Sequence, residues 1–426
     1  MPSTMGSKAR VDPSRAGTAR EHEAGERTST PAVHDDTDTG APAGTDDVRR
    51  LLDRTGARHP DPALDRWLAD VDAGDEAAET LLRRMYADMV VSRRLDAEAT
   101  ALQRQGELAL WPPLLGQEAA QVGSARALRD DDFVFSSYRE HAVAMIRGVR
   151  PEQVTPVWRG VAASGWNPYD VGMATPQVII GAQALHAVGY AFGILCDAER
   201  DPGRVPDGGT AATVAYVGDG AMSQGDVSEA LLFAATWSTP TVFVCQNNQW
   251  AISEPVSLQA PVPLAERGTG FGVPGVRVDG NDVLAVLAVT REALHRARTG
   301  GGPTLIEAVT YRMGPHTTAD DPTRYRSTEE VESWRRRDPI ERYAAWLRAR
   351  GTLTDAVEQE VRETADRTAA ELRAGCLALT DPPASRIFEH VYAEPHAALA
   401  AERDAYADYL ATLGDEAPAE AEGGAR

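Results

Sequence analysis

The chain has few cysteines: Cys196, Cys245 and Cys376 are the three among 426 residues, and they stand far apart. They form no CxxC pair, no zinc-type spacing and no disulfide framework. This scarcity excludes a small disulfide-stabilised secreted fold and favours a reducing compartment.

Long apolar segments and excess positive charge are also missing. No apolar run has the roughly 20 residues of a membrane-spanning helix. The N-terminus has no apolar signal-peptide core, and its many acids argue against a mitochondrial transit peptide. The net charge is -21, from 43 basic and 64 acidic residues, which disfavours binding to nucleic acid. We therefore expect a cytoplasmic protein with no membrane or nucleic-acid partner.

The two ends of the chain have almost no large apolar side chains. Residues 1–45 and 415–426 are rich in small and acidic residues, so we expect them to be disordered tails. With 42% hydrophobic residues overall, the remainder can bury a large core. Residues 46–414 are predicted to form a single domain.

The middle of the chain alternates β-rich and helical stretches. TVAYV (213–217) and TVFVC (241–245) flank the helical stretch SEALLFAATW, and GVRVDG (275–280) and PTLIEAVTYR (303–312) flank another. Apolar residues three and four positions apart predict a helix around 81–90, and 328–378 also reads as charged amphipathic helix. This order predicts an α/β fold: a doubly wound parallel sheet with helices on both faces and helical extensions at both ends.

One strand–helix–strand unit carries a polar side chain after each strand. Asp219 lies in the Gly-Asp-Gly turn at 218–220, and Asn248 follows the second strand; Asp226 is expected to cap the helix between them, with Glu229 as its capping-box partner. Carboxyl ends of parallel strands form the ligand-binding edge of open α/β sheets. Two oxygen ligands there favour Mg²⁺ or Ca²⁺, and such a cation would let an acid hold a diphosphate.

Other readings of the glycine-rich turn fit less well. Gly-Asp-Gly alone is also typical of a plain turn, but the strand at each end and the helix between them argue against that reading. A dinucleotide fingerprint requires a third glycine where this chain has Ser223, and a phosphate-binding P-loop requires a lysine that is missing here.

The GDG…NN pattern resembles the thiamin diphosphate motif, and further segments extend the resemblance over roughly 80–390. LLGQEAAQVGSARAL (114–128), SSYREHAVAMIRG (136–148), VIIGAQALHAVGYAFG (178–193) and TYRMGPHTTADDPTRYRS (310–327) are similar, in order, to the α subunit of thiamin-dependent 2-oxoacid dehydrogenases. The resemblance therefore implies the thiamin diphosphate-binding fold, with thiamin diphosphate and Mg²⁺ as cofactors.

The same resemblance implies a set of site residues. Asp219, Asn248 and the backbone carbonyl of Trp250 would be the metal ligands. Tyr138 and Arg139 would bind the diphosphate of the cofactor, together with the backbone amides of Gly220 and Ala221 in the turn that begins at Gly218. Ile180 would contact the aminopyrimidine ring.

Two residues of the loop after the last predicted strand are the catalytic candidates. His316 would lie at the cofactor and assist acyl transfer to lipoyl, and Arg312 stands on the same loop. His141 follows the Tyr-Arg pair and is a candidate for lining the site, whereas His186 lies in an apolar helix and is expected in the core. Mitochondrial relatives carry regulatory serines in the loop that matches 317–327, whereas here Thr317 stands beside His316, so we do not expect control by a kinase.

The resemblance also implies partners and a substrate class. The glutamate that activates thiamin would come from a separate β subunit in an α2β2 assembly, and the acyl group would pass to a lipoyl-bearing acyltransferase core. The TADDP segment favours a branched-chain 2-oxoacid (2-methylpropanoyl-transferring) enzyme over a pyruvate or acetoin dehydrogenase. Trp111 is a candidate pocket wall, with a core position as the alternative. Two alternative functions come from other classes of protein. They are a non-catalytic regulatory subunit and a nicotinamide-dependent dehydrogenase.

Overall fold

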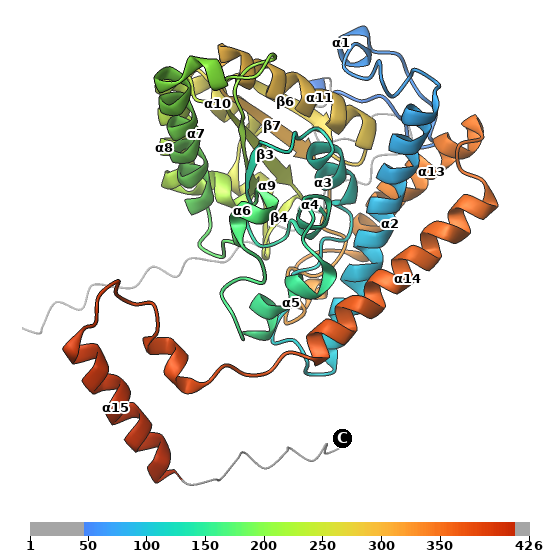
Figure 1. Ribbon diagram of the computed structural model, residues 1–426. Coiled ribbons are helices and arrows are strands. Elements are labelled where there is room, and N and C mark those ends of the chain that lie inside the picture. The colour runs from blue at the N-terminus through green and yellow to red at the C-terminus, as the bar shows by residue number, and fades with distance from the viewer. Residues whose placement is uncertain (1–46, 414–426) are drawn as a thin grey trace, which may run out of the picture. The chain divides into compact units, whose positions relative to one another are not determined.

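A five-stranded parallel sheet forms the centre of the chain, for which the computed structural model describes residues 47–413 (Figure 1). The predicted tails at 1–45 and 415–426 lie outside the described residues. The strands, in spatial order, are β1 (Phe133–Phe135), β2 (Thr213–Gly218), β3 (Thr241–Asn247), β7 (Thr304–Val309) and β6 (Gly275–Asp279). All four neighbouring pairs are parallel. The predicted α/β fold class is confirmed.

Alternate side chains of each strand enter two different cores, as the pleat of a strand requires. Along β2, Val214 and Tyr216 pack into one core, and Ala215 and Val217 into the other. The first core is covered by α3 (Glu118–Ala125), α4 (His141–Ile146) and α11 (Val283–Arg296); the second by α7 (Ala182–Arg200), α8 (Gly225–Trp237) and α10 (Ala265–Gly270). Both faces of the sheet are therefore buried, as in doubly wound folds.

Long helices extend the first core on the side away from the sheet. α2 (Glu76–Arg104) buries Leu82, Met85 and Met89, which confirms the helix predicted from their spacing. It packs against α13 (Pro339–Arg350) and α14 (Asp355–Leu377), which with α12 (Thr328–Arg335) account for the predicted amphipathic segment at 328–378. No helix within residues 47–413 combines the length and apolarity needed to span a membrane.

The remaining elements are short or peripheral. They are α1 (Pro62–Asp65), α5 (Pro151–Arg159), α6 (Pro168–Val171), α9 (Val256–Gln259), α15 (Ala397–Thr412) and the hairpin strands β4 (Trp250–Ala251) and β5 (Glu254–Pro255).

The start of α8 differs from the sequence prediction. A 3-10 turn over Gly220–Ser223 leads from β2 into the helix, which therefore begins at Gly225, with Gln224 at the N-cap position. Asp226 lies in the first turn instead of capping it, so the predicted cap is wrong. In the first turn, the negative charge of Asp226 still interacts favourably with the helix dipole at the N-terminus.

Candidate functional site

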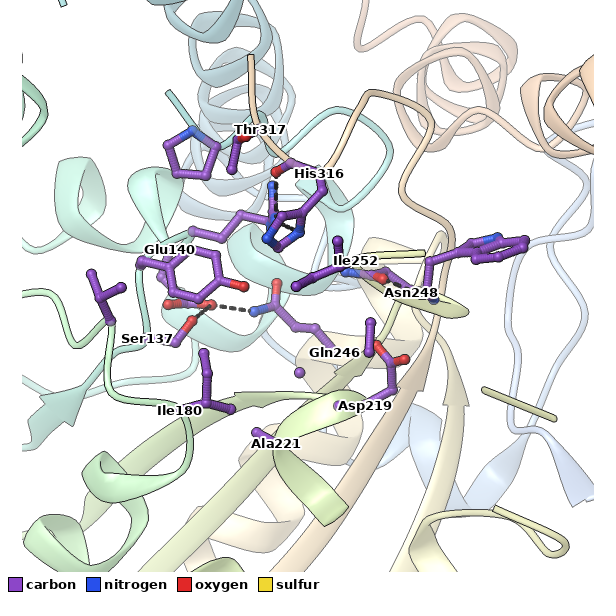
Figure 2. A pocket seen from close by; sticks show the side chains of 18 of the residues that line it. Ser137, Glu140, Ile180, Asp219, Ala221, Gln246, Asn248, Ile252, His316 and Thr317 are labelled. Atoms are coloured by element: carbon purple, nitrogen blue, oxygen red, sulfur yellow. Dashed lines mark hydrogen bonds between the residues drawn. The ribbon is translucent and has the colours of Figure 1, made fainter. Parts of the chain in front are cut away.

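Four strands end at one edge of the sheet, and the residues that follow them surround a cavity of about 450 Å³. Segments after β1, β2, β3 and β7 all reach this edge, as expected for an open α/β sheet. Every predicted cofactor or metal residue lines the cavity: Tyr138, Arg139, Ile180, Gly218, Asp219, Gly220, Ala221, Asn248, Trp250 and His316. Figure 2 shows Asp219 and Asn248 along one side of the cavity, with His316 above them.

Asp219 is buried with an oxygen that lacks a hydrogen-bond donor. The residue is only 1% exposed, and its Oδ2 contacts no donor among the described residues. Burial raises the pKa of its carboxyl to about 6. A buried carboxylate with one oxygen left unpaired is costly unless a cation neutralises it. This geometry fits a metal ligand.

Asn248 is held in one orientation by its neighbours. Its side-chain nitrogen donates to Gln117 Oε1 at 3.1 Å, and its Oδ1 accepts from the Trp250 amide at 3.2 Å. The contact with Gln117 therefore fixes the orientation of the Asn248 amide. Its oxygen is the atom that can bind a hard cation. Within residues 47–413, no cluster of three or more His, Cys, Asp or Glu side chains could hold a metal. The donors available here are instead one carboxylate, one amide and a backbone carbonyl.

The turn after β2 lies close against the β4–β5 hairpin. A Cβ on Gly220 would stand 2.6 Å from the Cβ of Ala251, whereas one on Gly218 would meet nothing within 4 Å. Glycine at 220 therefore lets the turn and the hairpin meet, and this contact brings Asp219 and Trp250 to the same side of the cavity.

Arg139 supplies positive charge to the cavity wall. It is 5% exposed, donates to the backbone carbonyl of Pro113, and donates to that of His316 at 3.0 Å. Its guanidinium also lies 5.4 Å from the ring of Tyr138. These contacts hold the Arg139 guanidinium in one position without any ligand. A guanidinium that is already oriented favours the binding of an anion such as phosphate.

His316 is a neutral imidazole held between two arginines. Its Nδ1 lies 3.3 Å from Arg139 Nη2 and 3.5 Å from Arg312 Nη1. Since guanidinium groups only donate, Nδ1 accepts and the proton resides on Nε2. Burial and these two cations lower the pKa of His316 to about 4. His316 can therefore donate a hydrogen bond from Nε2 at neutral pH without carrying a charge.

Arg312 lies behind the cavity wall. It is fully buried, and its guanidinium donates to the backbone carbonyls of Trp250 and Ile252 and to the Tyr325 hydroxyl. Of the predicted site residues, it is the one that does not line the cavity.

Sequence reasoning missed a buried polar pair in the wall. Gln246 Nε2 donates to Glu140 Oε1 at 2.6 Å, and Ser137 Oγ donates to the same oxygen at 3.3 Å (Figure 2). Burial raises the pKa of Glu140. Both residues adjoin recognised motifs: Glu140 follows the Tyr-Arg pair, and Gln246 precedes Asn-Asn. That adjacency was the available signal.

Three aromatic assignments need correction. Trp111 is fully buried outside the cavity lining, so the core alternative holds; its ring stacks on His141 at 4.1 Å. His141 does not line the cavity either, but contacts the carbonyl of Pro112, which does. His186 is exposed on α7, so the core prediction for it is wrong. The apolar wall is built from Leu110, Pro112, Trp158, Val178, Ile180 and Ile252.

The residues present fit a metal diphosphate cofactor. The unpaired Asp219 oxygen and the oriented Asn248 amide suit the metal, while Arg139 and the backbone of the Gly220 turn suit phosphate oxygens. The apolar wall around Ile180 and Ile252 suits an aromatic ring.

The fold and the cavity define a thiamin diphosphate-binding dehydrogenase component. A family model described as the dehydrogenase E1 component matches residues 86–373, and the chain belongs to that family. The resemblance drawn from the sequence is thereby confirmed, and the chain is a thiamin diphosphate-dependent oxidoreductase component.

Curated relatives are similar over most of their length. The 3-methyl-2-oxobutanoate dehydrogenase subunit alpha of Mycobacterium tuberculosis is 51% identical over 328 residues, which cover 76% of this chain and 86% of the relative. The pyruvate dehydrogenase E1 component subunit alpha of Staphylococcus epidermidis is 41% identical over 296 residues, covering 69% and 76%. That of Acholeplasma laidlawii is 39% identical over 338 residues, covering 78% and 94%.

Proposed function

We propose that this chain is the α subunit of a cytoplasmic branched-chain 2-oxoacid dehydrogenase (2-methylpropanoyl-transferring). It would decarboxylate the oxoacid and pass the acyl group to lipoyl. The observation that carries the proposal is the convergence of Asp219, Asn248, Arg139 and His316 on one cavity. The choice of substrate follows the relative at 51% identity over those at 41% and 39%.

In this proposal Asp219, Asn248 and the Trp250 carbonyl hold Mg²⁺. Tyr138, Arg139 and the amides of Gly220 and Ala221 hold the diphosphate, beside the Gly218 turn, and Ile180 contacts the aminopyrimidine. Asp219 changes from a costly buried acid into a ligand because the metal neutralises it.

Thiamin diphosphate supplies the nucleophilic carbon and the electron sink for loss of carbon dioxide. The protein must orient the oxoacid, exclude water and stabilise developing charge. His316 would donate a hydrogen bond from Nε2 to a substrate oxygen, and the pair of arginines on its Nδ1 keeps that tautomer in place. Arg312 serves the same centre through His316 and the hairpin.

The apolar wall of the cavity supports a branched acyl group. Leu110, Pro112, Trp158 and Val178 are apolar residues of the cavity lining. Each buried methyl group of a ligand gains about 1 kcal/mol in such surroundings, so discrimination between substrates is modest. Pyruvate is accordingly the runner-up substrate, in keeping with the names of the staphylococcal and acholeplasmal relatives.

A separate β subunit would complete the active site in an α2β2 assembly. In support, α7 and α8 expose an aromatic cluster: Phe192 and Phe233 lie 4.7 and 4.9 Å from the ring of Trp237. Beside it, Gly189 and Gly193 leave open space along α7. An apolar surface of this kind is typical of a subunit interface. The lipoyl group would come from the acyltransferase core.

The test is dye-linked decarboxylation by this chain co-expressed with a β subunit encoded beside it. Thiamin diphosphate and Mg²⁺ are supplied, and 3-methyl-2-oxobutanoate is compared with pyruvate. We expect a higher kcat/KM for the branched oxoacid. A higher value for pyruvate would move the assignment to the runner-up, and cofactor binding without turnover of either would favour a regulatory subunit or another oxoacid. Asp219→Ala should lose Mg²⁺-dependent cofactor binding, with Glu360→Gln, at an exposed position of α14 outside the cavity lining, as its control.

A further inference from the structure

Trp158, on α5, lines two cavities at once. One is the cavity of about 450 Å³ at the edge of the sheet, and the other is an adjoining cavity of about 10 Å³, close to the smallest that can hold a water molecule. Ser137, Tyr138 and Glu140 also line both. Trp158 is 6% exposed and has the largest side chain of these four residues. Its indole is therefore the largest part of the partition between the two cavities.

The indole of Trp158 is held in place by aromatic neighbours and by its helix. Its ring meets those of Trp111 and His141 edge to face, at centroid distances of 6.0 and 6.1 Å. Those two rings stack on each other at 4.1 Å. The next residue, Arg159, donates to the carbonyl of Cys376 at 2.9 Å, which ties the end of α5 to α14. A side chain packed in this way cannot move aside for a larger ligand without losing these contacts.

The wall to which Trp158 belongs lies at the His316 end of the large cavity. The carbonyl of Trp158 accepts from the amide of Ala109 at 2.9 Å. Two residues further on, the amide of Trp111 donates to Thr318 Oγ1 at 3.1 Å, and its carbonyl accepts from the Thr318 amide at 2.9 Å. Thr318 follows His316 by two positions. A short stretch of backbone therefore connects Trp158 with the surroundings of His316.

We propose that Trp158 is a specificity-determining residue that limits the size of the acyl group, so that short branched-chain 2-oxoacids are accepted and those with an aromatic side chain are excluded. The inference rests on the proposed function, because it requires the acyl group to lie beside His316. The cavity of about 450 Å³ must hold thiamin as well as substrate, so little room remains for the acyl chain. The fixed indole closes that room on one side.

The lining of the small cavity determines what a smaller residue at position 158 would admit. Five apolar residues line the small cavity and not the large one: Ala144, Val154, Trp166, Met173 and Pro176. Replacing the indole of Trp158 with a leucine side chain would join the two cavities and extend the acyl site toward these residues. The added room would suit an apolar ring.

The experiment uses the full chain with its co-expressed β subunit, thiamin diphosphate and Mg²⁺. Dye-linked decarboxylation of 3-methyl-2-oxobutanoate and of phenylpyruvate is measured in the parent, Trp158→Phe and Trp158→Leu. We expect Trp158→Leu to raise the kcat/KM for phenylpyruvate relative to the branched acid at least about tenfold, with Trp158→Phe in between, because contacts of this size in an apolar pocket change selectivity about 10-fold to 200-fold. Trp346→Leu is the matched control and should keep the parent's ratio: Trp346 is also 6% exposed but lines neither cavity.

Several results would overturn the proposal. An unchanged ratio in Trp158→Leu would do so, as would an equal rise in Trp346→Leu, which would assign the effect to a loosened core. If Trp158→Leu did not fold, an unchanged ratio in Trp158→Phe would decide against the size limit.

Failure of the proposed function would be a separate result. If the parent turned over neither oxoacid, the proposed function would fail, and calorimetric titration with 3-methylbutanoate and 3-phenylpropanoate would test the size limit by itself. Tighter binding of the phenyl acid by Trp158→Leu than by the parent would support the limit, and no difference would overturn it.

Discussion

The buried acid at the end of β2 leads to a prediction in which stability and function change in opposite directions. Asp219→Asn keeps the shape of the side chain and removes its charge. In the metal-free protein that charge is buried, 1% exposed, with no donor near Oδ2 among residues 47–413. The substitution should therefore stabilise the metal-free protein while it abolishes metal-dependent cofactor binding.

The magnitude follows from the pKa of Asp219. Burial raises this pKa from 3.8 to about 6 in the folded state, a difference worth up to roughly 3 kcal/mol. Below about pH 3 both folded and unfolded states are protonated, so the charge costs nothing. The cost accumulates between the two pKa values, where the unfolded state ionises while the folded state stays protonated, and it is complete once the pH is well above 6. Asp219→Asn should thus gain almost nothing at about pH 3 and up to about 3 kcal/mol at about pH 8.

The assay is urea unfolding of the full chain in EDTA at several pH values, repeated with Mg²⁺ and thiamin diphosphate. Cofactor and metal should stabilise the parent but not the variant. Asp282→Asn is the control: Asp282 is also buried, but its oxygens accept from four backbone amides, so an amide there should destabilise the fold. A metal-free Asp219→Asn protein less stable than the parent at pH 8 would refute the reasoning.

Three further predictions concern the same cavity. Gly220→Ala should lower the free energy of unfolding of the metal-free protein by about 1–3 kcal/mol, because its Cβ would stand 2.6 Å from that of Ala251; Gly218→Ala, which has room, should change it by less than 1 kcal/mol, and equal losses would contradict the contact. Burial and two neighbouring arginines lower the pKa of His316 to about 4, so its imidazole should stay neutral from about pH 8 down to about pH 5. A histidine nuclear magnetic resonance signal that titrates near about 6.5 and disappears in His316→Gln would contradict this prediction. Glu140 and Asp219 are the two acids in the described cavity lining. Because the activating glutamate is proposed to come from the β subunit, the chain alone should not exchange the C2 hydrogen of thiamin diphosphate. Exchange by the chain alone that disappeared in Glu140→Gln would instead assign the activating role to Glu140.

The part of the site that sequence could predict is the part fixed by strand ends. Asp219 and Asn248 each follow an apolar run, and parallel strands of one unit must end at one edge. Local pattern therefore brought these two side chains together. Arg139 and His316 are far away in sequence, and their placement came from the resemblance, because nothing local brings β1 and β7 next to this unit.

Other features of the site depend on long-range contacts that leave no local pattern. Leu110 and Trp158 face the same cavity from separate segments, and the Glu140–Gln246 pair joins β3 to the residues after β1. Conversely, residues that are neighbours in sequence can lie in different environments. Leu110 lines the cavity, whereas the side chain of the next residue, Trp111, lies in the core and donates from Nε1 to Asp96 at 2.7 Å. Composition alone cannot distinguish these two environments.

The error over His186 has a physical cause that bears on assembly. Helix α7 is apolar on more than one side: Ala184, Ala187 and Val188 pack toward the sheet, while Tyr190 and Phe192 are 39% and 40% exposed. A helix that is hydrophobic all round reads as a core helix from sequence. Among residues 47–413, the other elements cover one side of α7, and His186 lies on the opposite, exposed side. The exposed apolar side is the expected mark of a helix that a second subunit covers, so the same residues that misled the sequence reading support the proposed interface.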